Sequence, residues 1–476
     1  MRSWSANALV FGTSAAVLVL EIVAGRLLAP YVGISLETFT AIIGTVLAGI
    51  ALGAALGGRL ADHRDPHPLI AAALVIGGGL TWLSLPIVTA LGPRLGEDPP
   101  AIVALTTAAF LAPAAVLSAI SPMVAKLRLE SLDTSGAVVG SLSAAGTAGA
   151  LAGTFLTGFV LVATLPTRAI VMGAGAVLVA AGVIVWFRRG RGGSVGPALL
   201  FVAVTGSLGM SSRPPCDHET RYFCVSIVDD EDGAGRSLYL DDLRHAYIDL
   251  DDPTHLDIRY IRLFAQVSEA LPHGPVDALH IGGGGFTFPR YLADVRAGSE
   301  QLVLEIDPEL VHIVERELGL VLDEDLRVRV GDARLAVDDL ATDAYDLVIG
   351  DAFGSASVPW HLTTAEFVEE IHRVLRPDGL YVMNVIDGGH SRFARAELAT
   401  LAHEFNHVAV ILPAEGVPRN RPVNQVLLAS DAPLDAFSPA PDDGVLVSGD
   451  DAVRYIDGAR RLTDDFAPVD QLMMPT

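Results

Sequence analysis

The chain has 476 residues, 51% of them hydrophobic, and carries a formal net charge of −24 at pH 7. The charge is divided unevenly, because residues 1–212 hold eleven basic and eight acidic residues and the remainder holds 21 basic and 48 acidic residues, close to −27. An acidic domain has no positive field with which to hold phosphates, so the sequence excludes a nucleic-acid partner for the second half. The simplest interpretation of this acidity is a highly solvated surface.

Uncharged intervals divide the first 212 residues. A helix needs about 20 apolar residues to cross a hydrocarbon core of ~30 Å. Six intervals meet this requirement, and a seventh is marginal because Gly and Ser stand at both ends and Pro197 lies near its start. In chain order they are 3–20, 38–58, 69–93, 99–125, 134–167, 169–187 and 192–212. We therefore predict a multi-pass domain of six to seven helices over residues 1–212, surrounded by the lipid of the cell membrane.

Small residues recur at four-residue spacing in this half. The set consists of Gly49, Gly53, Gly57, Gly136, Gly140, Gly149 and Gly153. In lipid this spacing lets helix backbones approach each other closely, so we predict helix packing. A glycine-lined transport path is the alternative that the sequence leaves open.

Basic residues predict the orientation of these helices. The loops after spans two, four and six hold seven Arg or Lys residues, whereas the loops after spans one, three and five hold three. This places the N-terminus and the even-numbered loops in the cytoplasm. If the seventh interval crosses, the acidic half lies outside, where Cys216 and Cys224 suit a disulfide; if not, it lies inside. No further residues at metal-binding spacing accompany the cysteines, so we predict no metal site.

The second half alternates strand-like and helix-like segments. We predict strands at 276–281, 301–306, 328–330, 345–349 and 380–385, with 407–412 and 425–429 completing the sheet. A turn at 376–379 is expected before the fifth strand. This alternation predicts a mainly parallel, Rossmann-like sheet covered on both faces. The expected domains are a linker and β-hairpin region over 213–270 and an α/β nucleoside-binding domain over 271–476.

Glycine and acidic residues follow the first four predicted strands of this sheet. They are Gly282, Gly283, Gly284, Glu305, Asp332 and Asp351. Ligands of such sheets bind beyond the carboxyl ends of the strands, and the glycines would let the backbone approach a ligand. Glu305 is placed to hydrogen-bond a ribose diol, and Asp332 is placed to accept from an exocyclic amine such as that of adenine. Asp351 would face the reacting end of the ligand. The pattern predicts a nucleoside site.

These residues, together with the segment 235–241 and Tyr260, resemble the spermidine synthase (polyamine aminopropyltransferase) family in its membrane-fused bacterial form. The resemblance covers about residues 219–429. It implies a class I methyltransferase-type domain with a small N-terminal β-region and a transferase activity in polyamine biosynthesis. The implied co-substrate is decarboxylated S-adenosylmethionine, or S-adenosylmethionine itself, with no tightly bound cofactor. A putrescine-like amine is the implied small-molecule partner.

The resemblance also implies roles for individual residues. Tyr260 and Asp241 would contact the substrate, and Asp351 would be the catalytic aspartate that accepts a proton from the attacking amine. The nucleoside positions implied by the family are Gly282, Gly283, Gly284, Glu305, Asp307, Asp332 and Ala333.

Four positions depart from the family pattern. Phe223 follows Tyr222 where the family has glutamine, and Ile261 follows Tyr260 where it has histidine. Gly285 and Gly354 stand where the family has aspartates. Cations bound without carboxylates would be poorly stabilised. An S-adenosylmethionine-dependent methyltransferase and a non-catalytic ligand-binding membrane protein therefore remain as alternatives to the aminopropyltransferase, and a homo-oligomer stays open.

Overall fold

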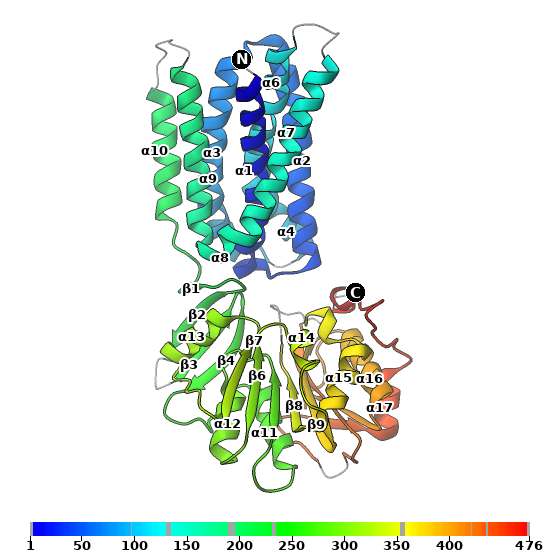
Figure 1. Cartoon of the computed structure of the whole chain (residues 1–476). Helices are drawn as coiled ribbons and strands as arrows, with labels where there is room; N and C mark the ends of the chain where they lie inside the picture. Colours follow the sequence, from blue (N-terminus) through cyan, green and yellow to red (C-terminus); the bar gives the residue numbers. More distant parts are fainter. Residues whose placement is uncertain are drawn as a thin grey trace. The chain divides into compact units, whose positions relative to one another are not determined.

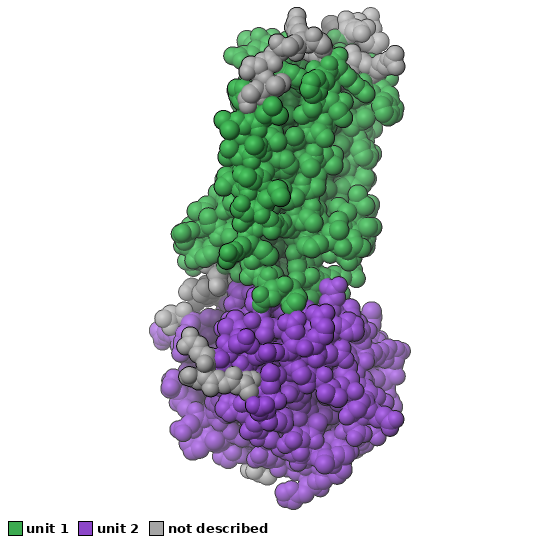
Figure 2. All heavy atoms as spheres, turned by 90° about the vertical axis from the view of Figure 1, so that its left-hand side faces the viewer, with its two compact units in different colours: residues 1–224 green, residues 225–476 purple. Residues whose placement is uncertain are grey.

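The computed structural model describes residues 3–96, 98–129, 135–188, 196–230, 235–352, 358–419, 421–434 and 437–473. The chain forms two compact units, Met1–Cys224 and Val225–Thr476, each held together by contacts among its own residues (Figure 2). Each unit is described by itself.

The first unit is a bundle of long apolar helices (Figure 1). In the described part of the chain, six helical spans have the length and composition needed to cross a membrane, as the sequence predicts. They are α1 (Ser3–Val32), α2 (Leu36–His63), α3 (Pro66–Leu91) with η1 (Gly92–Arg94), the span of α4 (Pro99–Thr106), η2 (Thr107–Leu111), α5 (Ala112–Ser118) and α6 (Ile120–Arg128), the span of α7 (Ser135–Leu156), η3 (Thr157–Leu161) and α8 (Val162–Thr164), and α9 (Thr167–Phe187). A shorter apolar helix, α10 (Gly196–Ser211), follows, and β1 (His218–Glu219) lies near the end of the unit.

Helix packing in the first unit uses part of the predicted small-residue pattern. A Cβ on Gly53 of α2 would lie 2.1 Å from the carbonyl oxygen of Ala115, and one on Gly149 of α7 would lie 2.1 Å from that of Phe11. Only glycine therefore permits these two helix contacts. Gly136 and Gly140 behave differently, because a Cβ on either would meet nothing within 4 Å.

The second unit is built on an eight-stranded mixed sheet with the order β12-β10-β11-β9-β8-β5-β6-β7. Its strands are β5 (Ala278–Ile281), β6 (Gln301–Glu305), β7 (Leu326–Val330), β8 (Tyr345–Gly350), β9 (Leu375–Asp387), β10 (His407–Leu412), β11 (Val423–Ser430) and β12 (Val445–Ser448). The pairs among β5 to β9 are parallel, whereas β10, β11 and β12 join antiparallel. The predicted class, a helical membrane-type domain followed by a Rossmann-like α/β domain, is confirmed.

A small antiparallel region precedes the large sheet. It contains β2 (Cys224–Asp229), β3 (Gly235–Leu240) and β4 (Leu243–Asp249). The pairing of β3 with β4 slips between Leu238 and Tyr239, so that His245 is the extra residue of a bulge. Bulges re-aim side chains and bend strands, and they are frequent beside functional sites.

Two apolar clusters hold helices against the large sheet. Along β9, Tyr381, Met383 and Val385 belong to one cluster, and Leu380 and Val382 belong to the other. This alternation shows that both faces of the sheet are buried. The helices are α11 (Arg259–Glu269), α12 (Thr287–Val295), α13 (Pro308–Glu317), α14 (Ala333–Val337), α15 (Ala365–Val374), α16 (Arg392–Glu404), α17 (Gly449–Ile456) and α18 (Val469–Met473), with the short 3₁₀ turn η4 (Trp360–Leu362).

The turn predicted at 376–379 is wrong. Leu375 pairs with Tyr345 and Leu380 pairs with Leu347, so the intervening residues are inserted within β9 as an irregularity of the strand. Arg376 stabilises this insertion by ion pairs of 2.5 Å to both Asp277 and Asp346. The sequence showed the Pro-Asp-Gly run but not the two carboxylates that hold it in the sheet.

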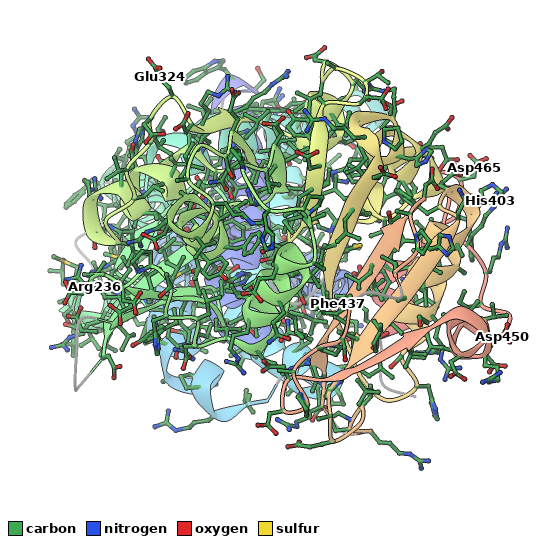
Figure 3. The ribbon with its side chains drawn as sticks, turned by 90° about the horizontal axis from the view of Figure 1, so that it is seen from below. Arg236, Glu324, His403, Phe437, Asp450 and Asp465 are labelled. Carbon is green, nitrogen blue, oxygen red and sulfur yellow. A yellow bond between two sulfur atoms is a disulfide. The ribbon has the colours of Figure 1, made fainter. Side chains whose placement is uncertain are left out.

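Several acidic side chains of the second unit are exposed to solvent. Figure 3 shows Glu324, Asp450 and Asp465 at its periphery, pointing outward, and all three are exposed. These exposed carboxylates agree with the interpretation of the acidity of this half as a solvated surface.

Candidate nucleoside and catalytic site

The glycine turn after β5 is shaped by close backbone contacts. Gly282 has a φ of +92° and Gly284 a φ of +50°, in the region that favours glycine. A Cβ on Gly282 would also lie 2.4 Å from the carbonyl oxygen of Asp351, so the ends of β5 and β8 meet there. The turn therefore brings its backbone to the carboxyl ends of the strands.

Glu305, the last residue of β6, holds this turn in place. Its Oε2 accepts hydrogen bonds from the N–H of Gly283 at 2.8 Å and of Gly284 at 3.3 Å, and its Oε1 accepts from the N–H of Asp307 at 2.9 Å. The side chain is only 4% exposed. Burial raises the pKa of Glu305, and the three N–H donors oppose that effect. A carboxylate has about four acceptor positions, so roughly one remains for a ligand hydroxyl.

Asp307 has a structural duty that the sequence did not reveal. Its Oδ1 accepts from the N–H of Glu309 at 3.0 Å and of Leu310 at 3.3 Å, which makes it the N-cap of α13. The side chain is fully buried. Pro308 occupies the first position of the helix, where its missing N–H is not needed. A nucleoside contact of Asp307 would have to coexist with this cap.

Asp332 and Ala333 lie at the start of α14, after β7. Asp332 accepts from the N–H of Arg334 at 2.9 Å, and its Oδ2 lies 3.5 Å from Nε2 of His361. Ala333 is buried in one of the two apolar clusters. Asp332 is partly exposed, so its carboxylate remains available beyond the sheet edge. His361, in η4, thereby joins the Asp332 end of the site.

Asp351 follows β8 and is held between two neighbours. Its Oδ2 accepts a hydrogen bond of 3.1 Å from the hydroxyl of Tyr260, and its Oδ1 accepts one of 3.0 Å from Nδ2 of Asn384. Burial raises the pKa of Asp351 to about 6, although both hydrogen bonds lower it. Such a carboxyl titrates close to neutral pH, which suits a group that accepts a proton during a reaction.

Tyr260 links the small β-region to this carboxylate. Its hydroxyl lies 3.1 Å from Oδ2 of Asp351 and 3.3 Å from the carbonyl oxygen of His245 at the β4 bulge. The side chain is 8% exposed, and burial raises its pKa well above the usual range, an effect that the Asp351 carboxylate strengthens. The tyrosine therefore remains a protonated hydrogen-bond donor at neutral pH.

Asp241 lies in the turn between β3 and β4. It adopts a left-handed conformation with a φ of +54°. Asp241 thus has the turn position that its type favours, and a substrate contact remains a prediction.

Comparison with known proteins shows what this unit is similar to. A 112-residue stretch is 36% identical to the polyamine aminopropyltransferase of Vibrio vulnificus, covering 23% of this chain and 38% of that protein. A stretch of 186 residues is 26% identical to the polyamine aminopropyltransferase of Chromobacterium violaceum, covering 39% of this chain and 70% of that protein. The C-terminal half of this chain is spermidine synthase-like.

Part of the spermidine synthase-like unit also matches a broader domain family. Residues 279–383 match the family described as a methyltransferase domain. A probable spermidine synthase from Corynebacterium glutamicum, of known structure, has 27% sequence identity and a TM-score of 0.49, and the match covers 53% of this chain and 97% of that one. The chain spans well under two thirds of the length of the Vibrio relative.

The departure at Gly285 has a steric cause in the spermidine synthase-like unit. A Cβ on Gly285 would lie 2.4 Å from Cβ of Ala246 and 2.9 Å from Cδ1 of Ile248, both on β4. The side chains of β4 thus occupy the space that an aspartate would need. Ile261 is buried in an apolar cluster, Phe223 belongs to the first compact unit, and Gly354 lies outside the described residues.

Sequence reasoning missed two residues near Asp351. Asn384 is 2% exposed on β9 and donates to Asp351, while its Oδ1 accepts from Nδ2 of Asn424 at 3.0 Å. A single amide within an apolar strand was the available signal, since buried polar groups require partners. His245 is the second residue, because its carbonyl oxygen lies 3.3 Å from the Tyr260 hydroxyl that contacts Asp351. Burial lowers the pKa of its imidazole to about 4.

Proposed function

We propose that the C-terminal unit binds decarboxylated S-adenosylmethionine and transfers its aminopropyl group to a small amine of the putrescine type. Glu305 would hold the ribose, Asp332 and Ala333 would lie at the adenine, and Asp351 would face the reacting carbon. The glycine turn would approach the nucleoside with its backbone. Tyr260 and Asp241 would contact the acceptor amine.

The proposed reaction is a single displacement. The lone pair of the amine nitrogen attacks the methylene carbon next to the sulfonium sulfur, and a carbon–nitrogen bond forms as the carbon–sulfur bond breaks. The electron pair of the broken bond goes to sulfur, which leaves as methylthioadenosine. The nitrogen loses one proton, and the carboxylate of Asp351 accepts it. No oxidant or further co-reactant is required.

The arrangement of Asp351, Tyr260 and Asn384 is the observation that supports this proposal. Both carboxylate oxygens are held by donors from different elements, α11 and β9, so the group is oriented before a substrate arrives. A pKa near 6 leaves Asp351 mostly ionised at neutral pH and able to accept a proton.

Binding and turnover measured together test the proposal. Purified full-length protein is titrated with decarboxylated S-adenosylmethionine, S-adenosylmethionine and methylthioadenosine, and product formation is followed with a panel of diamines. The proposal requires tighter binding of the decarboxylated ligand and release of methylthioadenosine with at least one amine. Nucleoside binding without turnover on any amine would reject aminopropyl transfer.

Methyl transfer is the second candidate, and the surroundings of Gly285 favour it. Because Ala246 and Ile248 occupy the space of the family's aspartate, no carboxylate stands at that position to repel the carboxylate of S-adenosylmethionine. The match of residues 279–383 to the methyltransferase domain family agrees with this reading. Formation of S-adenosylhomocysteine instead of methylthioadenosine in the same assay would establish the second candidate.

A further inference from the structure

The short helix α10 packs against the long helices of the first unit. In Figure 1 it lies beside α3 and α9. A Cβ on Gly79 of α3 would lie 2.3 Å from the ring of Phe201, and one on Gly209 would lie 3.0 Å from the sulfur of Met172 on α9. Near its end, the carbonyl oxygen of Met210 accepts a hydrogen bond from Arg168, the second residue of α9. Therefore α10 returns antiparallel to α9 and ends where α9 begins.

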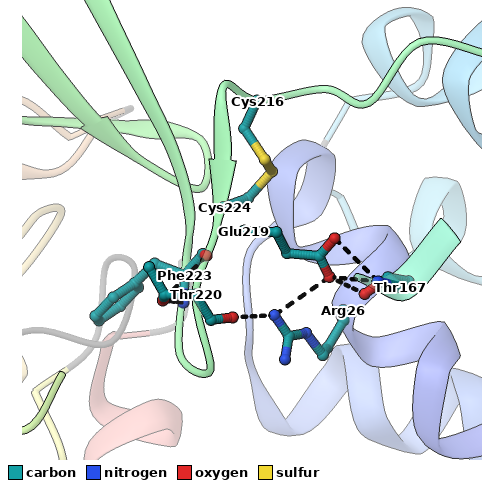
Figure 4. Close-up of a disulfide and its surroundings, with 7 residues drawn as sticks. All are labelled: Arg26, Thr167, Cys216, Glu219, Thr220, Phe223 and Cys224. Carbon is teal, nitrogen blue, oxygen red and sulfur yellow. Dashed lines mark hydrogen bonds and ion pairs between the residues drawn. A yellow bond between two sulfur atoms is a disulfide. The ribbon is translucent and has the colours of Figure 1, made fainter. Parts of the chain in front are cut away.

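The segment after α10 is attached to that same end of the bundle. The Arg26–Glu219 cluster, formed by Arg26, Thr167, Glu219 and Thr220, makes the attachment (Figure 4). Nη2 of Arg26 lies 3.2 Å from Oε1 of Glu219 and donates a hydrogen bond to the carbonyl oxygen of Thr220. Both oxygens of Glu219 accept from the N–H of Thr167 at 3.0 Å.

Shielding makes this attachment stronger than an ordinary surface ion pair. The side chains of Arg26 and Glu219 are 17% and 21% exposed, and the pair is reinforced by the backbone donor of Thr167. Exposed pairs contribute little, whereas hydrogen-bonded and partly buried pairs are harder to break. The chain therefore leaves the bundle at the end defined by the second half of α1 and the start of α9.

The two ends of the bundle differ in basic charge. Among the described residues, Arg59, Arg64, Lys126, Arg128 and Arg188 lie at the end where α2, α6 and α9 finish. Within the six spans, the opposite end has Arg26, Arg94 and Arg168. Two of these, Arg26 and Arg168, are engaged with the segment around α10, and Arg213 and Arg221 follow α10 outside these spans. Arg189 and Arg191, counted in the sequence, lie outside the described residues. Cytoplasmic ends of membrane helices are enriched in Arg and Lys, so the chain leaves at the non-cytoplasmic end.

A disulfide gives an independent indication of the same side. Cys216 and Cys224 are bonded, with Cα atoms 5.5 Å apart, and the loop they close contains Glu219 (Figure 4). Stable disulfides are typical of oxidising compartments and rare in the cytoplasm. The charge distribution and the disulfide rest on different residues and agree.

We propose that α10 is a seventh membrane crossing, so that the N-terminus is cytoplasmic and everything after α10 faces the oxidising, non-cytoplasmic side. With 16 residues, α10 is about 24 Å long, a few ångströms less than the ~30 Å core. Such a mismatch is tolerated by local thinning at modest cost. The orientation stands apart from the reaction proposed above. Where that proposed function also holds, the sulfonium nucleoside and the amine must be supplied outside the cytoplasm.

Fusion reporters on the full chain test the orientation in bacterial cells. Alkaline phosphatase, which folds only in an oxidising compartment, and a green fluorescent protein that is dark when exported are each joined after Thr476. We expect phosphatase activity and no fluorescence. Fluorescence without phosphatase activity would overturn the proposal. Neither reporter depends on a transferase activity of the protein itself.

Thiol labelling provides a second test at the disulfide itself. In the Cys216→Ser variant, the remaining Cys224 should react with a membrane-impermeant maleimide in intact cells. A matched control is the Asp65→Cys variant in a Cys216→Ser/Cys224→Ser background, which should label only after the cells are permeabilised. The reverse pattern would reject the orientation. If Cys216→Ser does not accumulate, Ser212→Cys in the cysteine-free background replaces it with the same expected result.

Discussion

The hydroxyl of Tyr260 donates a hydrogen bond of 3.1 Å to Oδ2 of Asp351, joining α11 to the end of β8 across 91 positions of the chain. The sequence assigned these residues separately, one to the substrate and one to proton transfer. Their contact makes the proposed catalytic carboxylate dependent on a residue outside the strands of the sheet, and it leads directly to the first two predictions.

The Asp351→Asn variant tests the proposed base. It keeps the shape of the side chain but removes its charge and basicity, so turnover should fall by about 10²–10⁴ while nucleoside binding changes little. In the wild type, kcat/KM should rise with pH through about 6, because only the ionised carboxylate accepts a proton. This rise on the acidic side of the pH–rate profile should be absent in the variant. Equal turnover in both proteins would remove Asp351 from the reaction, and the exposed Asp378→Asn serves as the control.

The Tyr260→Phe variant should move the acidic limb of the pH profile. The tyrosine hydrogen bond lowers the pKa of Asp351, so its loss should shift the limb upward by about half to one pH unit, which corresponds to ~1 kcal/mol. The difference between the pKa of Asp351 in the folded and in the unfolded chain also affects stability. Because the folded pKa of Asp351 is raised, its contribution is complete below about pH 4 and is lost as pH rises through about 6. A pH–rate profile that stays in place would show that Tyr260 does not tune Asp351.

The Glu305→Ala variant should lose both affinity and local order. The carboxylate accepts three backbone N–H groups and is proposed to hold a ribose hydroxyl, so nucleoside affinity should fall by roughly 1.5–4 kcal/mol. Calorimetry of Glu305→Ala beside the exposed Glu309→Ala measures the difference. Glu305→Gln keeps one acceptor oxygen for the glycine turn but turns its amide NH₂ toward the N–H of Asp307, so it should retain only part of the local order. Unchanged affinity in Glu305→Ala would place the ribose elsewhere.

The Gly285→Asp variant should lose stability without gaining activity. Its Cβ would lie 2.4 Å from that of Ala246, so the family's aspartate cannot be restored by one substitution. Overpacking should lower the stability of the unit by about 1–3 kcal/mol, and Ala246→Gly in the same chain should recover part of it. Thermal unfolding and amine turnover are measured together. An unchanged melting temperature with increased turnover would contradict the steric explanation.

The membrane unit offers a matched pair of substitutions on α7. Gly149→Ala places a Cβ against the carbonyl oxygen of Phe11 and should destabilise the bundle by about 1–3 kcal/mol. Gly140→Ala meets no neighbour within 4 Å and should be neutral or slightly stabilising. Thermal size-exclusion profiles in detergent compare them. Equal melting temperatures would show that the α1–α7 contact does not limit stability.

Local patterns were sufficient to predict the fold class and the strands that carry the candidate site. The run of uncharged intervals predicted the helices, and the strand ends at Glu305 and Asp351 followed from the alternation of apolar runs and glycine. The sequence was insufficient where the outcome depended on distant partners. The insertion in β9 needs Asp277 and Asp346, and the role of Asn384 needs Asp351 from another strand. Such contacts have no local signature.

Hydrogen bonds around Asn384, together with the peptide bond between Arg259 and Tyr260, lead from Asp351 back to Asp351. Asp351 accepts from Asn384, which accepts from Asn424, whose carbonyl accepts from Arg259. Arg259 precedes Tyr260 on α11, and Tyr260 returns to Asp351. Arg259 and Asp351 are thus connected through two sets of contacts, one by way of Asn424 and Asn384 and one by way of Tyr260. Substitutions at Arg259 and Asp351 should therefore have non-additive effects in a double-mutant cycle. The proposed catalytic carboxylate is best regarded as one member of a cooperative unit whose energy is not divisible among its residues.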